Sequence, residues 1–163
     1  MGKSVVIAGC RAGAQLSAEV VECYGGVIER EGVQSELTSL QDIDSAFADT
    51  ELCVRLEEHI GGRDVYLIQS LFNPRGRGTV NENYMALLIA LRTFREHGAR
   101  SVCATTPYLA DARQDKPTRF KREPTTARLM ADMCIEAGVD RIVVWHPHCR
   151  QIQGFYGRIP VTM

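Results

Sequence analysis

The sequence predicts a three-layer, doubly wound α/β domain with a mainly parallel sheet. Two patterns predict it: short β-branched apolar runs recur without strict polar alternation, and segments with helical spacing lie between them. Alternating strands and helices with short connections take right-handed crossovers, so helices should cover both faces of the sheet. A length of 163 residues fits one domain with a sizeable core, and we expect residues 1–163 to form it.

Two different kinds of strand are expected in the first part of the chain. "SVVIAG" (4–9) is a continuous apolar run, which is typical of a buried strand. "ELCVRLEE" (51–58) alternates instead, with Leu52, Val54 and Leu56 on one side and Cys53, Arg55 and Glu57 on the other. Alternation is typical of a half-exposed strand, so we expect an antiparallel hairpin at the edge of the sheet here.

A second buried strand and a helix follow. "DVYLIQS" (64–70) has the pattern of a buried strand, and the next segment, 81–97, has helical spacing. Its apolar stripe consists of Tyr84, Leu87, Leu88 and Leu91. Gly98 stands where the C-terminal cap of such a helix belongs.

The last two buried strands are predicted at "SVCATT" (101–106) and "RIVVWH" (141–146). Between them the spacing predicts a helix over 124–137, with Pro124 in its first turn and Gly138 at its end. One face of this helix carries Met130, Met133, Cys134 and Ala137. Helical spacing alone explains that stripe as core.

The composition narrows the class of protein. Hydrophobic residues make up 45% of the sequence and charged residues 24%, and the formal net charge of -1 gives no global reason to bind nucleic acid or a membrane. The six cysteines form no CxxC pair, and the first residues have neither the length nor the pattern of a secretory signal. We therefore expect a cytoplasmic protein with reduced cysteines.

A polar cluster follows strand 101–106. It consists of Arg113, Gln114, Asp115 and Lys116. In an open α/β sheet, ligands bind beyond the carboxyl ends of the strands. Arginine and lysine donate to phosphate oxygens, a glutamine amide can pair with the edge of a base, and the helix that follows adds the positive end of its dipole. The alternative is a solvated, charged loop.

Two further loops offer weaker signals. His146 and His148 are two residues apart and Cys149 follows, so a zinc site is conceivable, although no fourth ligand stands at suitable spacing. Histidines at a strand end are otherwise simply hydrogen-bonded residues. The segment "NPRGRGTVNEN" (73–83) has two arginines between glycines that could hold an anion, but it matches neither common phosphate-loop pattern and is otherwise a surface loop.

Seven segments match one family in register from about residue 45 to the last residue. They are "FADTEL" (47–52), "GGRDVYLIQS" (61–70), "NENYMALLIAL" (81–91), "YLADARQDK" (108–116), "EPTTARLMAD" (123–132), "AGVDRIVV" (137–144) and "HCRQIQGFYGRIPV" (148–161). On these segments the chain resembles the N-terminal half of ribose-phosphate pyrophosphokinase, also called phosphoribosyl pyrophosphate synthetase. The combination of the Arg-Gln-Asp-Lys loop with His148 and the Gln-Ile-Gln-Gly-Phe run is specific to that family.

The resemblance implies a phosphoribosyltransferase-like fold and a chemical reaction. The family transfers the β,γ-pyrophosphoryl group of ATP to the anomeric hydroxyl of ribose 5-phosphate, with Mg²⁺ as cofactor, and gives phosphoribosyl pyrophosphate and AMP. Its subunits assemble into homo-oligomers, as dimers and hexamers. The implied partners are therefore ATP, ribose 5-phosphate and further copies of the chain, and neither nucleic acid nor a membrane.

The resemblance also implies roles for residues near the ends of two strands. Arg113 and Gln114 would hold the nucleotide, with Asp115 and Lys116 shaping the same loop. His148 would lie at the triphosphate and its magnesium, as the catalytic and metal-binding residue. Such a site agrees with the chemistry, because phosphoryl-type transfer depends on positioning and charge neutralisation.

A hairpin is implied as the second part of the nucleotide site. Phe47, Asp49, Thr50 and Glu51 match a hairpin that, in the family, reaches into a neighbouring subunit to enclose adenine. Two positions depart from the family pattern: Thr50 replaces its glycine, and Ala46 replaces its usual basic residue.

Other departures from the family pattern leave alternative functions open. His146-Pro147-His148 stands where the family has Asp-Leu-His, extra residues occupy 75–79, and the family's second half, with its ribose-phosphate loop, is absent from these residues. The chain is predicted to be the ATP-binding half of the enzyme and inactive by itself. A non-catalytic relative with a regulatory or assembly role is the alternative, and nucleic-acid binding through 113–128 is a weaker third, because stacking aromatics beyond Phe120 are lacking.

Overall fold

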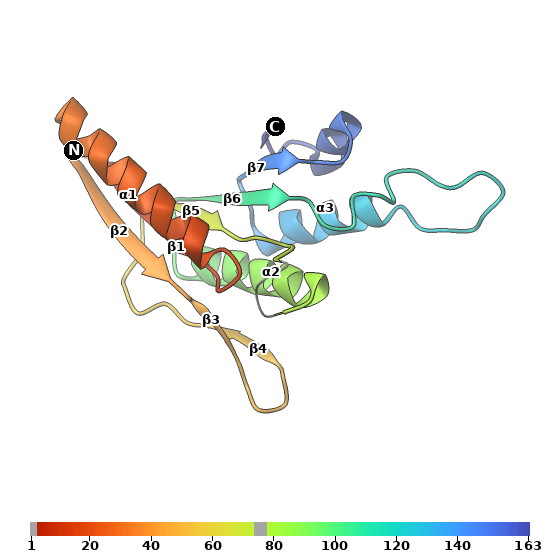
Figure 1. Ribbon diagram of the computed structural model, residues 1–163, viewed down its shortest axis with the longest axis horizontal. Coiled ribbons are helices and arrows are strands. Elements are labelled where there is room, and N and C mark those ends of the chain that lie inside the picture. The colour runs from red at the N-terminus through yellow and green to blue at the C-terminus, as the bar shows by residue number, and fades with distance from the viewer. Residues whose placement is uncertain (1–2, 74–77) are drawn as a thin grey trace.

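The computed structural model describes residues 3–73 and 78–163. In these residues the main sheet has six strands, all paired in parallel, in the order β2-β1-β5-β6-β7-β8 (Figure 1). Their bounds are β1 (Lys3–Gly9), β2 (Ser35–Gln41), β5 (Asp64–Ile68), β6 (Ser101–Tyr108), β7 (Arg141–His146) and β8 (Val161–Thr162). The chain leaves β1 toward one edge and builds the rest of the sheet toward the other, which confirms the doubly wound prediction.

Helices lie on both faces of this sheet. They are α1 (Ala14–Glu31), α2 (Val80–Glu96) and α3 (Thr126–Ala137), followed by the short 3-10 helix η1 (Arg150–Tyr156). On one face α1 packs on a small cluster of Val5, Ile7 and Ile68. On the other face α2, α3 and η1 enclose the larger core, so each layer is held by apolar burial.

The expected hairpin exists but is smaller and separate. β3 (Asp44–Ala46) and β4 (Leu52–Val54) pair antiparallel in a two-stranded sheet of their own. Figure 1 shows it projecting from the body of the sheet beneath β2. The apolar side chains of Leu52, Val54 and Leu56 pack against the larger core, as the alternation predicted, but the strand ends at Val54 and does not join the edge of the main sheet.

The predicted strands and helices are confirmed with shifted ends. β5 stops at Ile68, two residues before the predicted limit, and β6 continues to Tyr108. Gly98 and Gly138 both follow their helices with φ in the left-handed region, at 80° and 100°. Placing Pro124 in the first turn was wrong: α3 begins at Thr126, because the backbone of Thr125 is not helical (φ -86°, ψ 81°).

Part of the sheet face that carries α1 is left uncovered within the described residues. By the register of β5, β6 and β7, Tyr66, Val143 and Trp145 lie on the same face as Ile68. α1 reaches Ile68, but Tyr66 is 45% exposed and Trp145 57% exposed. The carboxyl end of β7 is therefore open to solvent on this side.

A buried hydroxyl joins the two helices on the opposite face. Tyr84 of α2 is almost fully buried, and its hydroxyl donates to the carbonyl oxygen of Met130 in α3 at 2.6 Å. The same hydroxyl lies 3.0 Å from the sulfur of Cys134. Burial and the neighbouring Cys134 thiol raise the pKa of Tyr84, so the side chain stays a neutral donor.

Replacing Tyr84 by phenylalanine should lower the free energy of unfolding by about 1–2 kcal/mol, because a buried hydrogen bond is lost while the packing is kept. Urea unfolding followed by circular dichroism measures the change. Tyr66→Phe is the matched control, since that ring is half exposed and its substitution should have almost no effect. Equal losses in the two variants would contradict the assigned role of the Tyr84 hydroxyl.

Candidate functional site

Two loops start together at the carboxyl ends of β6 and β7. These strands are parallel neighbours with Tyr108 opposite His146, and the N–H of Leu109 donates to the carbonyl oxygen of His146 at 3.1 Å. The loop of residues 109–116 and the turn of residues 147–151 therefore leave the sheet from one fixed point. This is the sheet edge at which ligands bind in open α/β folds.

Two adjoining cavities lie at these loops. The first, of about 350 Å³, is lined by Tyr108, Leu109, Ala112, Arg113, His146, Pro147 and His148. The second, of about 660 Å³, is lined by Phe72, Val80, Asn81, Tyr108, Asp111, Arg113 and Gln114. Arg113 lines both, so the structure brings Arg113, Gln114 and His148 to one place. Their part in binding stays a prediction.

Gln114 is held by the first turn of α3. Its carbonyl oxygen accepts from the N–H of Ala127 at 3.2 Å, and its side-chain oxygen accepts from the hydroxyl of Thr126. Because Thr126 occupies the side-chain oxygen, the amide nitrogen of this exposed residue is the group that we expect to donate to a ligand. The helix thus fixes the direction of this side chain instead of leaving it to solvent.

Asp115 differs from its neighbours because its side chain is only 1% exposed, whereas that of Lys116 is 72% exposed. The Cys149 thiol and the Lys116 ammonium both stabilise the charged form and lower the pKa of the Asp115 carboxyl to about 2. Because the pKa is lowered in the folded state, the ionised carboxylate contributes its full stabilisation of the fold at pH values above 3.8, the usual pKa of an aspartate. That contribution is lost as the pH falls through about 2.

His146 and His148 line the same cavity, but the structure gives no support to the hypothesis of a zinc site there. His148 has φ 70°, in the left-handed region, so the chain turns sharply between the two imidazoles. Within residues 3–73 and 78–163, no group of three or more His, Cys, Asp or Glu side chains is placed to hold a metal ion. The donors at this turn are imidazoles, whereas Mg²⁺ prefers a shell of oxygens, so the described residues do not fit a magnesium site made by protein alone.

The hairpin residues lie away from these cavities in the same chain. Phe47 is 55% exposed, and Asp49, Thr50 and Glu51 are exposed around it. The tip is closed by the N–H of Phe47 donating to the Glu51 carbonyl at 2.8 Å. Thr50 has φ 76°, a backbone conformation that suits the glycine expected there. Figure 1 shows this tip and the 109–123 loop at separate ends of the molecule.

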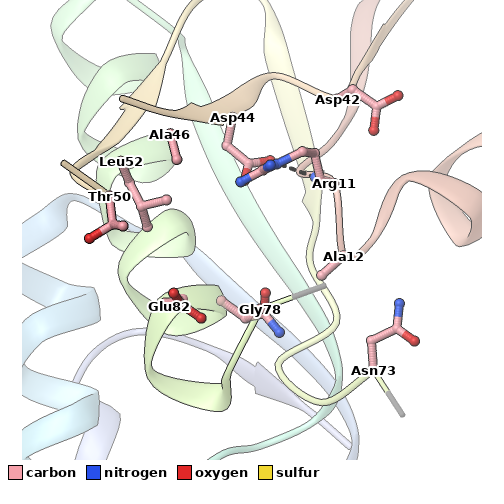
Figure 2. A pocket seen from close by; sticks show the side chains of 11 residues that line it. Arg11, Ala12, Asp42, Asp44, Ala46, Thr50, Leu52, Asn73, Gly78 and Glu82 are labelled. Atoms are coloured by element: carbon pink, nitrogen blue, oxygen red, sulfur yellow. Dashed lines mark hydrogen bonds and ion pairs between the residues drawn. The ribbon is translucent and has the colours of Figure 1, made fainter. Parts of the chain in front are cut away.

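Sequence reasoning missed a third cavity, of about 420 Å³, beneath this hairpin (Figure 2). Arg11 donates from its backbone N–H and its Nε to the carboxylate of Asp44, which is buried. Asp42 and Glu82 also line the cavity, so three carboxyl side chains and one guanidinium border it. An excess of negative charge does not favour binding of a triphosphate here, so the cavities at Arg113 remain the better candidate for a nucleotide site. The one available signal was Arg11, two residues after the end of strand 4–9.

The two arginines of the predicted anion-binding segment cannot be placed at any cavity. Arg75 and Arg77 lie outside the described residues, whereas Asn73, Gly78, Glu82 and Asn83 of the predicted segment 73–83 line the third cavity.

Comparison with known proteins decides the family. Residues 5–138 match a family model described as the N-terminal domain of ribose phosphate pyrophosphokinase. The chain belongs to this family. A solved relative, the phosphoribosylpyrophosphate synthetase from Mycobacterium smegmatis, superposes on 98% of the chain with a TM-score of 0.80 and 31% identity.

Curated ribose-phosphate pyrophosphokinases are similar at the level of sequence. The one from Coxiella burnetii is 40% identical over 112 residues, which are 69% of this chain and 34% of the relative. The one from Fusobacterium nucleatum is 37% identical over 130 residues, which are 80% of this chain and 38% of the relative. The chain thus spans about a third of the length of the ribose-phosphate pyrophosphokinases it matches, and 47% of the Mycobacterium smegmatis chain. Among the helices of the described residues, none is long and apolar enough to cross a membrane.

Proposed function

We propose that this chain is the ATP-binding half of a ribose-phosphate pyrophosphokinase. In that reaction the anomeric hydroxyl of ribose 5-phosphate takes the β,γ-pyrophosphoryl group of ATP, and AMP leaves. One observation carries the proposal: Arg113 and Gln114 after β6 and His148 after β7 surround adjoining cavities at one sheet edge. Family membership supports the proposal over residues 5–138, which include Arg113 and Gln114.

The proposed roles follow from the donors at this edge. Arg113 presents a planar, two-pronged donor that fits phosphate oxygens, and its side chain is exposed between both cavities. Gln114 offers its amide nitrogen to the nucleotide, Lys116 adds an exposed cation, and His148 donates to the triphosphate. Charge neutralisation and alignment of this kind are the main protein contribution to such transfers.

Magnesium would reach this site on the nucleotide. Because the described side chains do not form an oxygen shell, the phosphates themselves would supply ligands to the ion, as is common for Mg²⁺ in phosphoryl-transfer sites. The six cysteines all lie in the described residues and are free thiols, which supports the proposed cytoplasmic setting.

The hairpin is proposed to complete the site of a second copy. Phe47 presents an exposed ring and Asp49 and Glu51 present acceptors at a tip that lies away from Arg113 of its own chain. An aromatic face with acceptors suits an adenine ring and its amino group. The working unit is therefore a homo-oligomer in which each nucleotide site takes residues from two chains.

Mixing two defective chains tests this arrangement. Arg113→Ala and Phe47→Ala should each bind Mg-ATP weakly as pure proteins. When they are co-refolded in equal amounts, about a quarter of the sites should regain wild-type affinity, because half of the pairs are mixed and each mixed pair has one site with both intact elements. Calorimetric stoichiometry measures the recovered fraction.

The matched control pairs Arg113→Ala with Gln114→Ala, which alter the same side of the site and should recover nothing. Recovery in this control, or wild-type binding by pure Phe47→Ala, would remove the hairpin from the site. A wild-type chain that assembles but does not bind Mg-ATP would favour the non-catalytic alternative.

A further inference from the structure

Asp115 joins the two loops of the proposed nucleotide site from beneath. It stands next to Gln114, in an exposed loop, yet its carboxylate is buried and turned toward the residues that follow His148. We propose that Asp115 is a positioning residue, whose carboxylate clamps the turn after β7 and so sets the separation of Arg113 and Gln114 from His148. This inference rests on the proposed function of the site.

Two donors reach the clamp from the opposite loop. The Oδ2 atom of Asp115 accepts from the Nε2 of Gln151 at 2.6 Å and from the Sγ of Cys149 at 2.9 Å. Its Oδ1 atom accepts from the Nζ of Lys116, at 3.0 Å, in its own loop. The carboxylate therefore links segments that are 34 and 36 residues apart in sequence.

The clamp acts next to the residues that would touch the nucleotide. Cys149 directly follows His148, and Asp115 directly follows Gln114, so each of these two clamp residues is the immediate sequence neighbour of a proposed ligand-binding residue. In the described part of the chain, beyond the strand-end bond between Leu109 and His146, the loop and the turn are joined by these Asp115 hydrogen bonds. Losing them would leave the two loops tied only at the sheet.

The charge of Asp115 makes the clamp specific. A carboxylate that accepts from a thiol, an amide and an ammonium is a strong acceptor. An asparagine would keep the size of Asp115 but has no charge and one acceptor oxygen in place of two, so its N–H₂ would face either Lys116 or the donors of the opposite loop. Asp115→Asn therefore weakens the clamp without leaving a cavity.

The test compares Mg-ATP affinity and hydrogen exchange in the assembled 163-residue protein. Asp115→Asn should weaken Mg-ATP binding about tenfold or more, and should increase amide exchange in residues 148–151. The double variant Asp115→Asn with Gln151→Glu reverses amide and carboxylate, and should recover much of the lost affinity. A merely structural role would not produce that rescue. Asp132→Asn is the control, because Asp132 pairs with Arg128 on the exposed surface of α3.

Cys149 supplies a second test if Asp115→Asn fails to fold. Cys149→Ser keeps a donor and should bind nearly as the wild type does, whereas Cys149→Ala should bind several-fold more weakly. Equal affinity in the two Cys149 variants, or amide exchange in residues 148–151 that Asp115→Asn leaves unchanged, would overturn the clamp. If wild-type protein does not bind Mg-ATP, the proposed function fails, and hydrogen exchange alone then decides on the clamp.

Discussion

Replacing Arg113 by alanine should weaken Mg-ATP binding to the assembled protein about 10- to 100-fold, the range expected for losing hydrogen bonds to a charged ligand. Arg113 lines both cavities at the ends of β6 and β7, so its guanidinium is the group best placed to contact phosphate and base together. Because the side chain is exposed, its removal should leave the unfolding temperature almost unchanged. Isothermal titration calorimetry measures the affinity.

Two substitutions make the result specific. Arg113→Lys keeps the charge but replaces a two-pronged donor by a point charge, so binding should fall between wild type and Arg113→Ala. Arg119→Ala removes a cation from the same basic loop whose guanidinium stacks on its own neighbour, Phe120, and should change affinity little. Equal losses in Arg113→Ala and Arg119→Ala would mean that general charge, and not this site, attracts the nucleotide.

The 163 residues alone should not make phosphoribosyl pyrophosphate, even where they bind Mg-ATP. Transfer requires the anomeric hydroxyl of ribose 5-phosphate to be held in line with the β-phosphorus, and such positioning accounts for a large part of the rate. Ribose 5-phosphate also needs a grip on its own phosphate. The third cavity is lined by three carboxyl side chains and one guanidinium, a balance of charge that does not favour a second phosphate. Without a site that holds ribose 5-phosphate in this position, turnover should be lower by orders of magnitude.

Release of AMP from ATP and ribose 5-phosphate measures this prediction. The 163-residue protein should release AMP no faster than its His148→Ala variant, in which the proposed donor to the triphosphate is missing. Clear turnover above that variant would show that the acceptor site lies within these residues.

The sequence predicted the buried centre of the sheet better than its margins. β5, β6 and β7 were predicted from their apolar runs, and all three pack one face into the larger core, while their other face is covered only in part. β2 escaped prediction because it is an edge strand: "SELTSLQ" is mostly polar, and only Leu40 in it is fully buried. α1 escaped because Gly25 and Gly26 interrupt its pattern, at positions where an added side chain would meet nothing.

For the candidate site, the sequence could predict which loops are neighbours but not the direction in which their side chains point. Arg113 and His148 follow neighbouring strands, and parallel strands bring their carboxyl ends to one edge. Nothing in the spacing shows that Asp115 turns inward while Lys116 turns outward, since that depends on donors more than 30 residues away. The cavity at Arg11 and Asp44 was missed for the same reason, because their pairing spans 33 residues.

The open face at the end of β7 has an optical consequence. Trp145 is the one tryptophan in the 163 residues, and it stands directly before His146, in contact with solvent on the α1 side. Tryptophan fluorescence from these residues therefore comes from one side chain and needs no added label. Its wavelength reports the polarity at one end of one strand, three residues from His148, and a stopped-flow trace excited selectively at the indole follows that location alone.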